Sequence, residues 1–208
     1  MDKDKDKDIF YYYDLEEKSH SLKRFDDVLL ARKKIAEFHL IDKEYQEAWQ
    51  DYQEIAHLYL WFKNNPNEAH SAYWKSLDIK RKAKSEKYLP EDSFDFGDEM
   101  CVYYYDESCE LRRITFCLYL MEKYEELLLH LKTYAYVDHE KDLESIIFQG
   151  QAYSKLGKIN EAENIWNNLG KDSLTGIEKL EEDYSIFTNK KEIICFSECK
   201  KYLSSKMS

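Results

Sequence analysis

The sequence predicts an all-α protein, and three observations lead to that fold class. Two prolines and five glycines are all that interrupt 208 residues, whereas sheet proteins need frequent turns. Apolar residues recur at helical spacing along most of the chain. The segments IFYYY and CVYYY contain residue types that favour strands, but each is isolated and lies beside a helical pattern. We therefore expect about eight or nine helices and no sheet.

A short charged tail precedes a single helical domain in the predicted organisation. Residues 1–8 alternate acidic and basic side chains and are expected to be disordered. Residues 9–208 are expected to form one all-helical domain, long enough to bury a substantial core. Leu22, Phe25 and Leu29 open the first apolar pattern with broadly helical spacing.

The apolar spacing and the breaks between patterns define nine expected helices. Pro66, within NNPNEA, marks a helix start. The segment YLPEDSFDFGDEM holds the other proline and the first glycine, and it separates two patterns. In RRITFCLYLM the apolar residues face two sides, which predicts a helix buried between neighbours. The expected helices span residues 19–40, 44–62, 68–87, 107–121, 123–136, 141–156, 160–169, 174–187 and 190–203.

The segment GQAYSKLGKINEAENIW carries the signature of two helices joined by a tight turn. Gly157 has the position of a left-handed residue that ends a helix, where a side chain has a steric cost. Asn160 is expected to cap the next helix, with Glu163 three positions later in a capping-box arrangement. Gly150 and Ala162 are small residues that let the two helices approach closely.

This hairpin resembles the tetratricopeptide repeat, a helix–turn–helix unit of about 34 residues. The match covers residues 143–176, and less extensive matches lie at 29–62 and 108–141. The resemblance implies antiparallel hairpins stacked in a degenerate repeat array, with an unrelated helical bundle as the alternative. Ile146, Gln149 and Leu174 depart from the family pattern. The matching residues are Gly150, Tyr153, Gly157, Ala162 and Trp166.

Composition and charge exclude several classes of function. A formal net charge of −11 disfavours nucleic-acid binding and suits a partner with a basic surface. Five cysteines without framework spacing indicate reduced thiols in a cytoplasmic protein. The segment MDKDKDKDIF lacks the apolar core of a secretory signal. The apolar runs FCLYLM and LYLWF fall far short of the roughly 18 residues that a membrane span needs.

No catalytic, metal-binding or cofactor-binding motif is present in the sequence. His139 lies between Asp138 and Glu140, for which a polar helix start is a simpler explanation than an acid–base or metal site. Cys195 and Cys199 supply at most half of a zinc site, and buried free thiols are the favoured interpretation. We therefore expect no enzyme activity, no metal and no cofactor.

An acidic and aromatic segment is the predicted site of partner binding. Residues 88–111 contain eight acids and no basic residue, directly after a basic stretch between Lys75 and Lys87. Aromatic anchors ringed by acids suit a basic protein surface. The alternative is that the aromatics pack inward while the acids pair with the preceding basic helix. The predicted contact residues are Glu91, Asp92, Asp95, Phe96, Asp98, Glu99, Tyr103, Tyr104, Tyr105 and Asp106.

A second acidic and aromatic patch, IFYYYDLEE, lies near the N-terminus and has the same two interpretations.

Together these features predict a non-catalytic protein-binding module. Within that class we favour a small acidic inhibitor, such as an immunity protein that neutralises a basic toxin domain. A chaperone or adaptor for a secreted or regulatory protein is the second hypothesis. An enzyme with an unrecognised site is the third.

Overall fold

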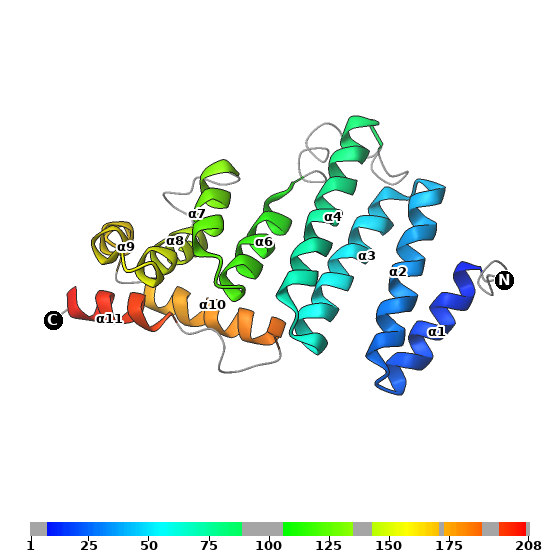
Figure 1. Ribbon diagram of the computed structural model, residues 1–208, viewed down its shortest axis with the longest axis horizontal. Helices are drawn as coiled ribbons and strands as arrows, with labels where there is room; N and C mark the ends of the chain where they lie inside the picture. Colours follow the sequence, from blue (N-terminus) through cyan, green and yellow to red (C-terminus); the bar gives the residue numbers. More distant parts are fainter. Residues whose placement is uncertain (1–7, 89–105, 135–142, 171–172, 189–195, 207–208) are drawn as a thin grey trace. The chain divides into compact units, whose positions relative to one another are not determined.

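The computed structural model describes residues 8–88, 106–134, 143–170, 173–188 and 196–206 (Figure 1). These residues form ten α-helices, one short π-helix and no strand, so the all-α prediction is confirmed for this part of the chain. No helix within the described residues is both long enough and apolar enough to cross a membrane. The chain divides into two compact units, residues 1–110 and 111–208, and each is described by itself.

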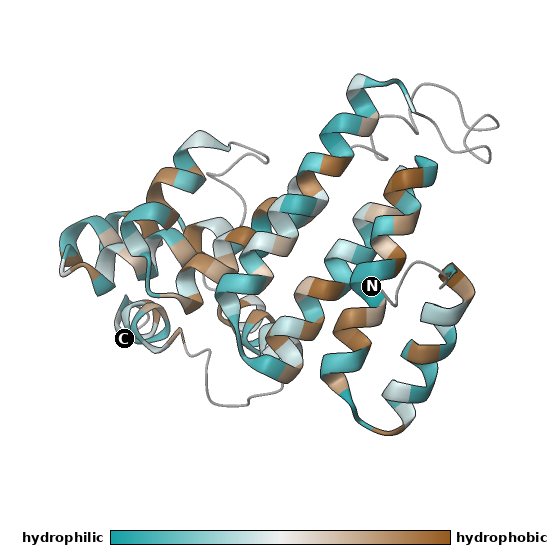
Figure 2. Cartoon of the chain, turned by 45° about the vertical axis from the view of Figure 1, so that its right-hand side comes forward, coloured by the Kyte–Doolittle hydropathy of each residue, from teal (hydrophilic) through white to brown (hydrophobic). Residues whose placement is uncertain are grey.

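The first unit consists of helices that pack against their neighbours along the chain. In Figure 1, α2, α3 and α4 lie side by side, and α1 packs on α2. Each helix carries hydrophobic and hydrophilic positions in alternation around its axis, as the colours of Figure 2 show. The elements are α1 (Ile9–Ser21), α2 (Phe25–Asp42), α3 (Tyr45–Leu58), the π-helix η1 (Tyr59–Lys63) and α4 (Pro66–Ser85).

Helix α1 corrects the prediction of one helix over 19–40. The chain instead turns at residues 22–24, where Lys23 has a φ of 56°, and α2 begins only at Phe25. Asp8, expected to be part of the disordered tail, caps α1 by accepting a hydrogen bond from the Tyr11 backbone N–H at 2.9 Å. Residues 1–7 of that tail lie outside the described residues.

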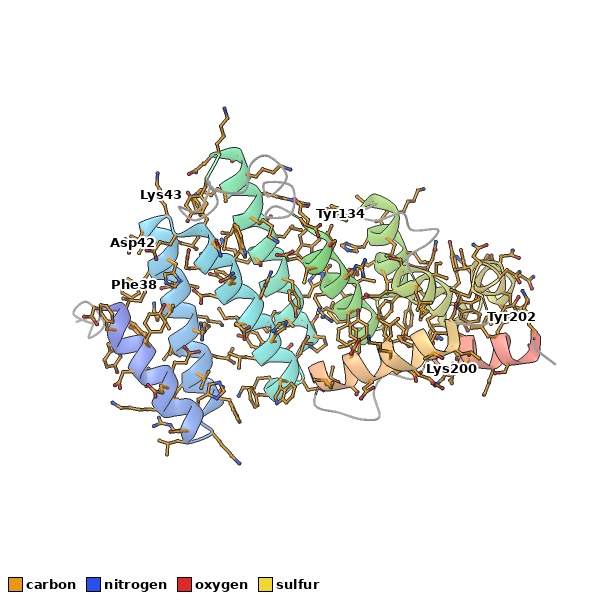
Figure 3. The ribbon with its side chains drawn as sticks, turned by 180° about the vertical axis from the view of Figure 1, so that it is seen from behind. Phe38, Asp42, Lys43, Tyr134, Lys200 and Tyr202 are labelled. Atoms are coloured by element: carbon orange, nitrogen blue, oxygen red, sulfur yellow. The ribbon has the colours of Figure 1, made fainter. Side chains whose placement is uncertain are left out.

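The tyrosines of IFYYY lie in α1 because one of them packs against α2. Tyr12 is buried in a cluster with Ala31 and Ile35, and its ring lies 6.0 Å from that of Phe38. Figure 3 labels Phe38 on α2 beside the start of α1. Residue types that favour strands do so because they fit a half-buried surface. Helix α1 gives Tyr12 the same burial, so the segment can be helical despite its strand-type residues.

The core between α3 and α4 holds the ends of both helices together. Tyr45, Ala48 and Trp49 of α3 are buried against Ile79 and Ala83 of α4. Pro66 takes the first position of α4, as predicted, and the preceding asparagine caps the helix. The prediction of a helix over 44–62 is confirmed, except that its last turn is the π-helix η1.

The second unit contains α6 from Leu111 onward and the helices that follow it, and aromatic side chains form part of its core. The rings of Phe116 and Tyr184 stack at 4.1 Å, and Phe148 lies 5.6 Å from both Tyr184 and Phe196. The helix predicted to be buried on two sides is α6, whose Ile114 and Phe116 are fully buried. The elements are α6 (Ser108–Leu120), α7 (Tyr124–Thr133), α8 (Leu143–Lys155), α9 (Ile159–Trp166), α10 (Ser173–Thr188) and α11 (Ser197–Lys206).

The α8–α9 hairpin has the predicted turn and the predicted close contact. Gly157 has a φ of +74°. A Cβ added to Gly150 would lie 2.6 Å from two ring atoms of Trp166, so only glycine fits there without a shift. The predicted capping box is wrong, because α9 begins at Ile159 and Asn160 lies inside its first turn. No side chain caps this helix.

The same turn recurs in the three segments that were matched to the repeat. Lys43, Glu122 and Gly157 all have positive φ, and the next residue donates its N–H to the carbonyl five positions earlier. A small, buried residue lies seven positions before each turn: Ala36, Thr115 and Gly150. A fully buried residue lies five positions after it: Ala48, Leu127 and Ala162. Stacking of the hairpins into a repeat array stays a prediction.

Candidate protein-binding surface

The sequence-predicted contact segment is described only at its C-terminal end. Asp106 is exposed and serves the start of α6, where its carboxylate accepts hydrogen bonds from the Ser108 N–H at 2.9 Å and from the Ser108 hydroxyl at 2.7 Å. The other predicted contact residues lie outside the described residues: Glu91, Asp92, Asp95, Phe96, Asp98, Glu99, Tyr103, Tyr104 and Tyr105.

The acids next to Asp106 pair with the basic helix α4. Arg81 donates to both carboxylate oxygens of Glu107, at 2.7 to 3.1 Å. Lys80 contacts the fully buried Glu110 at 2.7 Å and donates to the Asp106 carbonyl at 2.8 Å. For Glu107 and Glu110, the structure therefore shows the alternative in which these acids pair within the chain.

The second acidic and aromatic patch forms an exposed surface on α1. Phe10 is 75% exposed and Tyr13 is 41% exposed, and Asp14 and Glu17 are exposed beside them. Residues 10, 13, 14 and 17 share one side of a helix because they are spaced three or four apart. We call these four residues the α1 face. Both of its acids point to solvent, although Asp14 also pairs with Lys18.

A buried polar network holds α1 against α2 and α3. Arg32 of α2 contacts Glu16 of α1 at 2.6 Å and Asp51 of α3 at 3.0 Å. Asp51 also accepts a hydrogen bond from the ring nitrogen Nδ1 of His39 at 2.7 Å. The Tyr13 hydroxyl lies 3.2 Å from Nε2 of the same ring. The network fixes Tyr13 and the helix that carries the α1 face.

Burial and charge shift the pKa values of two members of this network. Burial raises the pKa of Tyr13, and the negative charge of Asp51 raises it further. Burial alone would lower the pKa of Arg32, but hydrogen bonds and charges from Asp51 and Glu16 outweigh burial and raise it. Tyr13, His39 and Asp51 have the order of a hydroxyl–imidazole–carboxylate relay. In this arrangement the Asp51 carboxylate orients the His39 imidazole, and the imidazole in turn contacts the Tyr13 hydroxyl.

The cysteines and histidines of the described residues form no group suited to a metal. No cluster of three or more His, Cys, Asp or Glu side chains that could hold a metal ion is found in the described part of the chain. His139 and Cys195 lie outside it. Cys199 is buried, and burial raises its pKa to about 12. Burial also raises the pKa of Cys117, whereas Cys109 is exposed.

Each of the two units also has a groove on its surface. In the second unit, Tyr153 of α8 helps to line a groove of about 330 Å³ with Gln149 and with Leu128, Leu129 and Lys132 of α7. In the first unit, a groove of about 420 Å³ separates α2 from η1. No motif in the sequence indicates that the segments lining each groove lie side by side, so neither groove could be predicted from the sequence.

No protein-family model matches the chain, and no curated protein or solved structure matches it either. The resemblance to the tetratricopeptide repeat therefore stays a prediction that rests on the matched residues.

Proposed function

We propose that this chain is a non-catalytic protein-binding module of stacked helical hairpins, and that the α1 face docks a partner with a basic surface. The observation that carries the proposal is the exposure of Phe10 and Tyr13 beside Asp14 and Glu17 on a helix whose other side is locked in place. Large aromatic side chains gain the most from burial at an interface, and exposed acids steer a basic partner toward them.

The rigidity of α1 adds to the case for binding. A helix that is already ordered avoids the entropic cost of folding on contact. Arg32 joins α1 to two further helices through Glu16 and Asp51, and Tyr12 anchors it in an apolar cluster. The chain's net charge of −11 also favours encounter with a cationic surface.

Within this class, the specific proposal is an acidic immunity protein that neutralises a basic toxin domain. Acidity and a surface that offers aromatic anchors suit the masking of a cationic partner. A chaperone or adaptor differs from an inhibitor in its client. An inhibitor binds one folded domain and stops its activity, whereas a chaperone binds an extended segment.

The test begins with a photo-crosslinking amino acid placed at Phe10 in native cells. A matched control carries the same amino acid at Ile186, which is 56% exposed on α10. We expect a basic protein to crosslink at position 10 and not at position 186. The purified partner is then titrated with wild type, with Phe10→Ala and with Glu17→Lys. Glu182→Lys, at an exposed acid of α10, is the control for net charge.

The expected result is a loss of affinity of about tenfold or more for each α1-face variant, and a weaker salt dependence for Glu17→Lys. Equal affinity for wild type and both variants would remove the α1 face from the proposal. A triple variant, Asp95→Lys with Asp98→Lys and Glu99→Lys, tests the segment predicted from the sequence in the same titration. Loss of the partner's activity on binding distinguishes an inhibitor from a chaperone.

A further inference from the structure

The groove between α2 and η1 combines apolar side chains with ammonium groups. On α2 it is lined by Asp26, Leu29, Leu30 and Lys33, which fall on one helix face because their spacing is three or four residues. Leu30 is 51% exposed, so the apolar side of the groove is open to a partner. The opposite wall consists of Tyr59, Lys63 and Asn65.

The two lysines of the groove differ in how their charge is used. Lys63 pairs with Asp26 at the groove's edge. Lys33 donates a hydrogen bond to the Tyr59 hydroxyl at 2.7 Å, and it forms no ion pair with a carboxylate of the described residues. An ammonium group has three N–H donors, so Lys33 keeps donors for a ligand. The Tyr59 hydroxyl, which accepts from Lys33, can donate its own proton to the same ligand.

The wall opposite α2 has an unusual backbone. Tyr59–Lys63 form a π-helix that ends at Asn64 in the left-handed region, with a φ of 48°. Short π-helical turns are rare and occur frequently at functional sites. Here the π-helix supplies Tyr59 and Lys63, two of the three polar residues on this wall.

We propose that this groove binds an acidic amphipathic helix of a partner protein. Leu30 would receive an aliphatic side chain of the partner beside the buried Leu29, and Lys33 with Tyr59 would receive a carboxylate one turn away along α2. In a helix-in-groove complex the docked helix places apolar anchors, spaced i, i+3, i+4 and i+7, in the groove and keeps its polar side chains at the rim. This site is distinct from the α1 face. Both lie on the first unit, but the groove would bind an acidic partner, whereas the α1 face would bind a basic one.

The probe is a labelled helical peptide with leucines at i, i+3, i+4 and i+7 and glutamates at the other positions. A second peptide has lysine in place of every glutamate. Binding is measured by fluorescence anisotropy to the full-length wild type, Lys33→Glu, Lys33→Met and Leu30→Ala. The matched control is Lys34→Glu, the same charge change at the neighbouring residue, which pairs with Glu37 and does not line the groove. Circular dichroism confirms that each variant is folded.

The glutamate peptide should bind the wild type saturably. Lys33→Glu and Lys33→Met should weaken it by about tenfold or more, as expected for loss of a charged hydrogen bond, and Lys34→Glu by less than about twofold. Lys33→Glu should also favour the lysine peptide. Absence of saturable binding overturns the proposal, as do equal binding of both peptides and an equal effect of Lys33→Glu and Lys34→Glu. Crosslinking at Phe10 does not depend on this groove, so failure here leaves the α1 face standing.

Discussion

The contact between Gly150 and Trp166 provides a quantitative test of the α8–α9 hairpin. In Gly150→Ala, the new Cβ would lie 2.6 Å from the ring atoms Cδ1 and Cε2 of Trp166. The indole is 3% exposed and packs 5.8 Å from the ring of Tyr202, so it has little room to withdraw. Figure 3 labels Tyr202 on α11, the helix that covers this side of α9.

Two opposing effects decide the sign of the change. Alanine is favoured over glycine in a helix interior by about 1 kcal/mol. Overpacking of a filled core costs about 1–3 kcal/mol, and a rigid buried ring lies at the upper end of that range. We therefore expect Gly150→Ala to lower the free energy of unfolding by about 1–2 kcal/mol. The measurement is urea-induced unfolding followed by far-UV circular dichroism.

The matched control is Gly176→Ala, the same substitution in helix α10. Its Cβ would also be close to a neighbour, 2.5 Å from Cδ2 of Leu143. That atom is the end of a flexible, partly exposed side chain that can rotate away. Helix propensity should then offset the remaining cost, and the free energy of unfolding should change by less than about 0.5 kcal/mol.

A double-mutant cycle isolates the contact itself. Trp166→Phe shrinks the ring and removes an indole N–H that has no hydrogen-bond partner among the described residues. Gly150→Ala should be nearly neutral in this background, which corresponds to a coupling energy of at least about 1 kcal/mol. The reasoning is refuted if Gly150→Ala stabilises the wild type as helix propensity alone requires. An equal cost in both backgrounds would refute it as well.

Three further predictions concern turns, thiols and alkaline pH. Glu122→Gly should raise the free energy of unfolding by about 0.5–1 kcal/mol in urea titrations, because Glu122 has a φ of 59° that glycine adopts without steric cost. Site-resolved alkylation at pH 8 should modify exposed Cys109 rapidly, while Cys199, whose pKa burial raises to about 12, reacts only after unfolding. The hydrogen bond to Glu86 and burial raise the pKa of Tyr45, whereas an unfolded tyrosine ionises near pH 10. Its contribution to stability is therefore complete below about pH 10 and is lost as the pH rises through the folded value. Urea midpoints between about pH 9 and 11.5 should fall more steeply for wild type than for Tyr45→Phe, and identical slopes would contradict this assignment.

Most helices could be predicted because their apolar residues repeat with a helical period and their turns contain clear breaks. Gly157 and Pro66 are examples of residues whose backbone geometry is local, so the turn and the helix start follow from the residue itself. Other turns cannot be predicted in this way, because Lys43 and Glu122 adopt the same left-handed geometry although neither residue type favours it. Their conformation is held by hydrogen bonds between a helix end and the following residue.

Helix α1 and its face depended on contacts that no local pattern contains. IFYYY has strand-type residues, and its helical state comes from Asp8 at its start and from the burial of Tyr12 on α2. The network that locks α1 joins residues 16, 32 and 51, which lie on three separate helices. Glu16 and Asp51 meet at the guanidinium of Arg32 only when the three helices have packed together.

The amino-acid sequence alone was enough to specify an acidic, all-helical chain, the Gly157 turn and the close contact that Gly150 permits. These features depend on composition, on periodicity and on backbone preferences that each residue carries with it. Tertiary structure decided which acids form ion pairs within the chain and which are exposed to solvent. Glu107 and Glu110 pair with α4, whereas Asp14 and Glu17 reach solvent, because burial and pairing depend on which helices pack together.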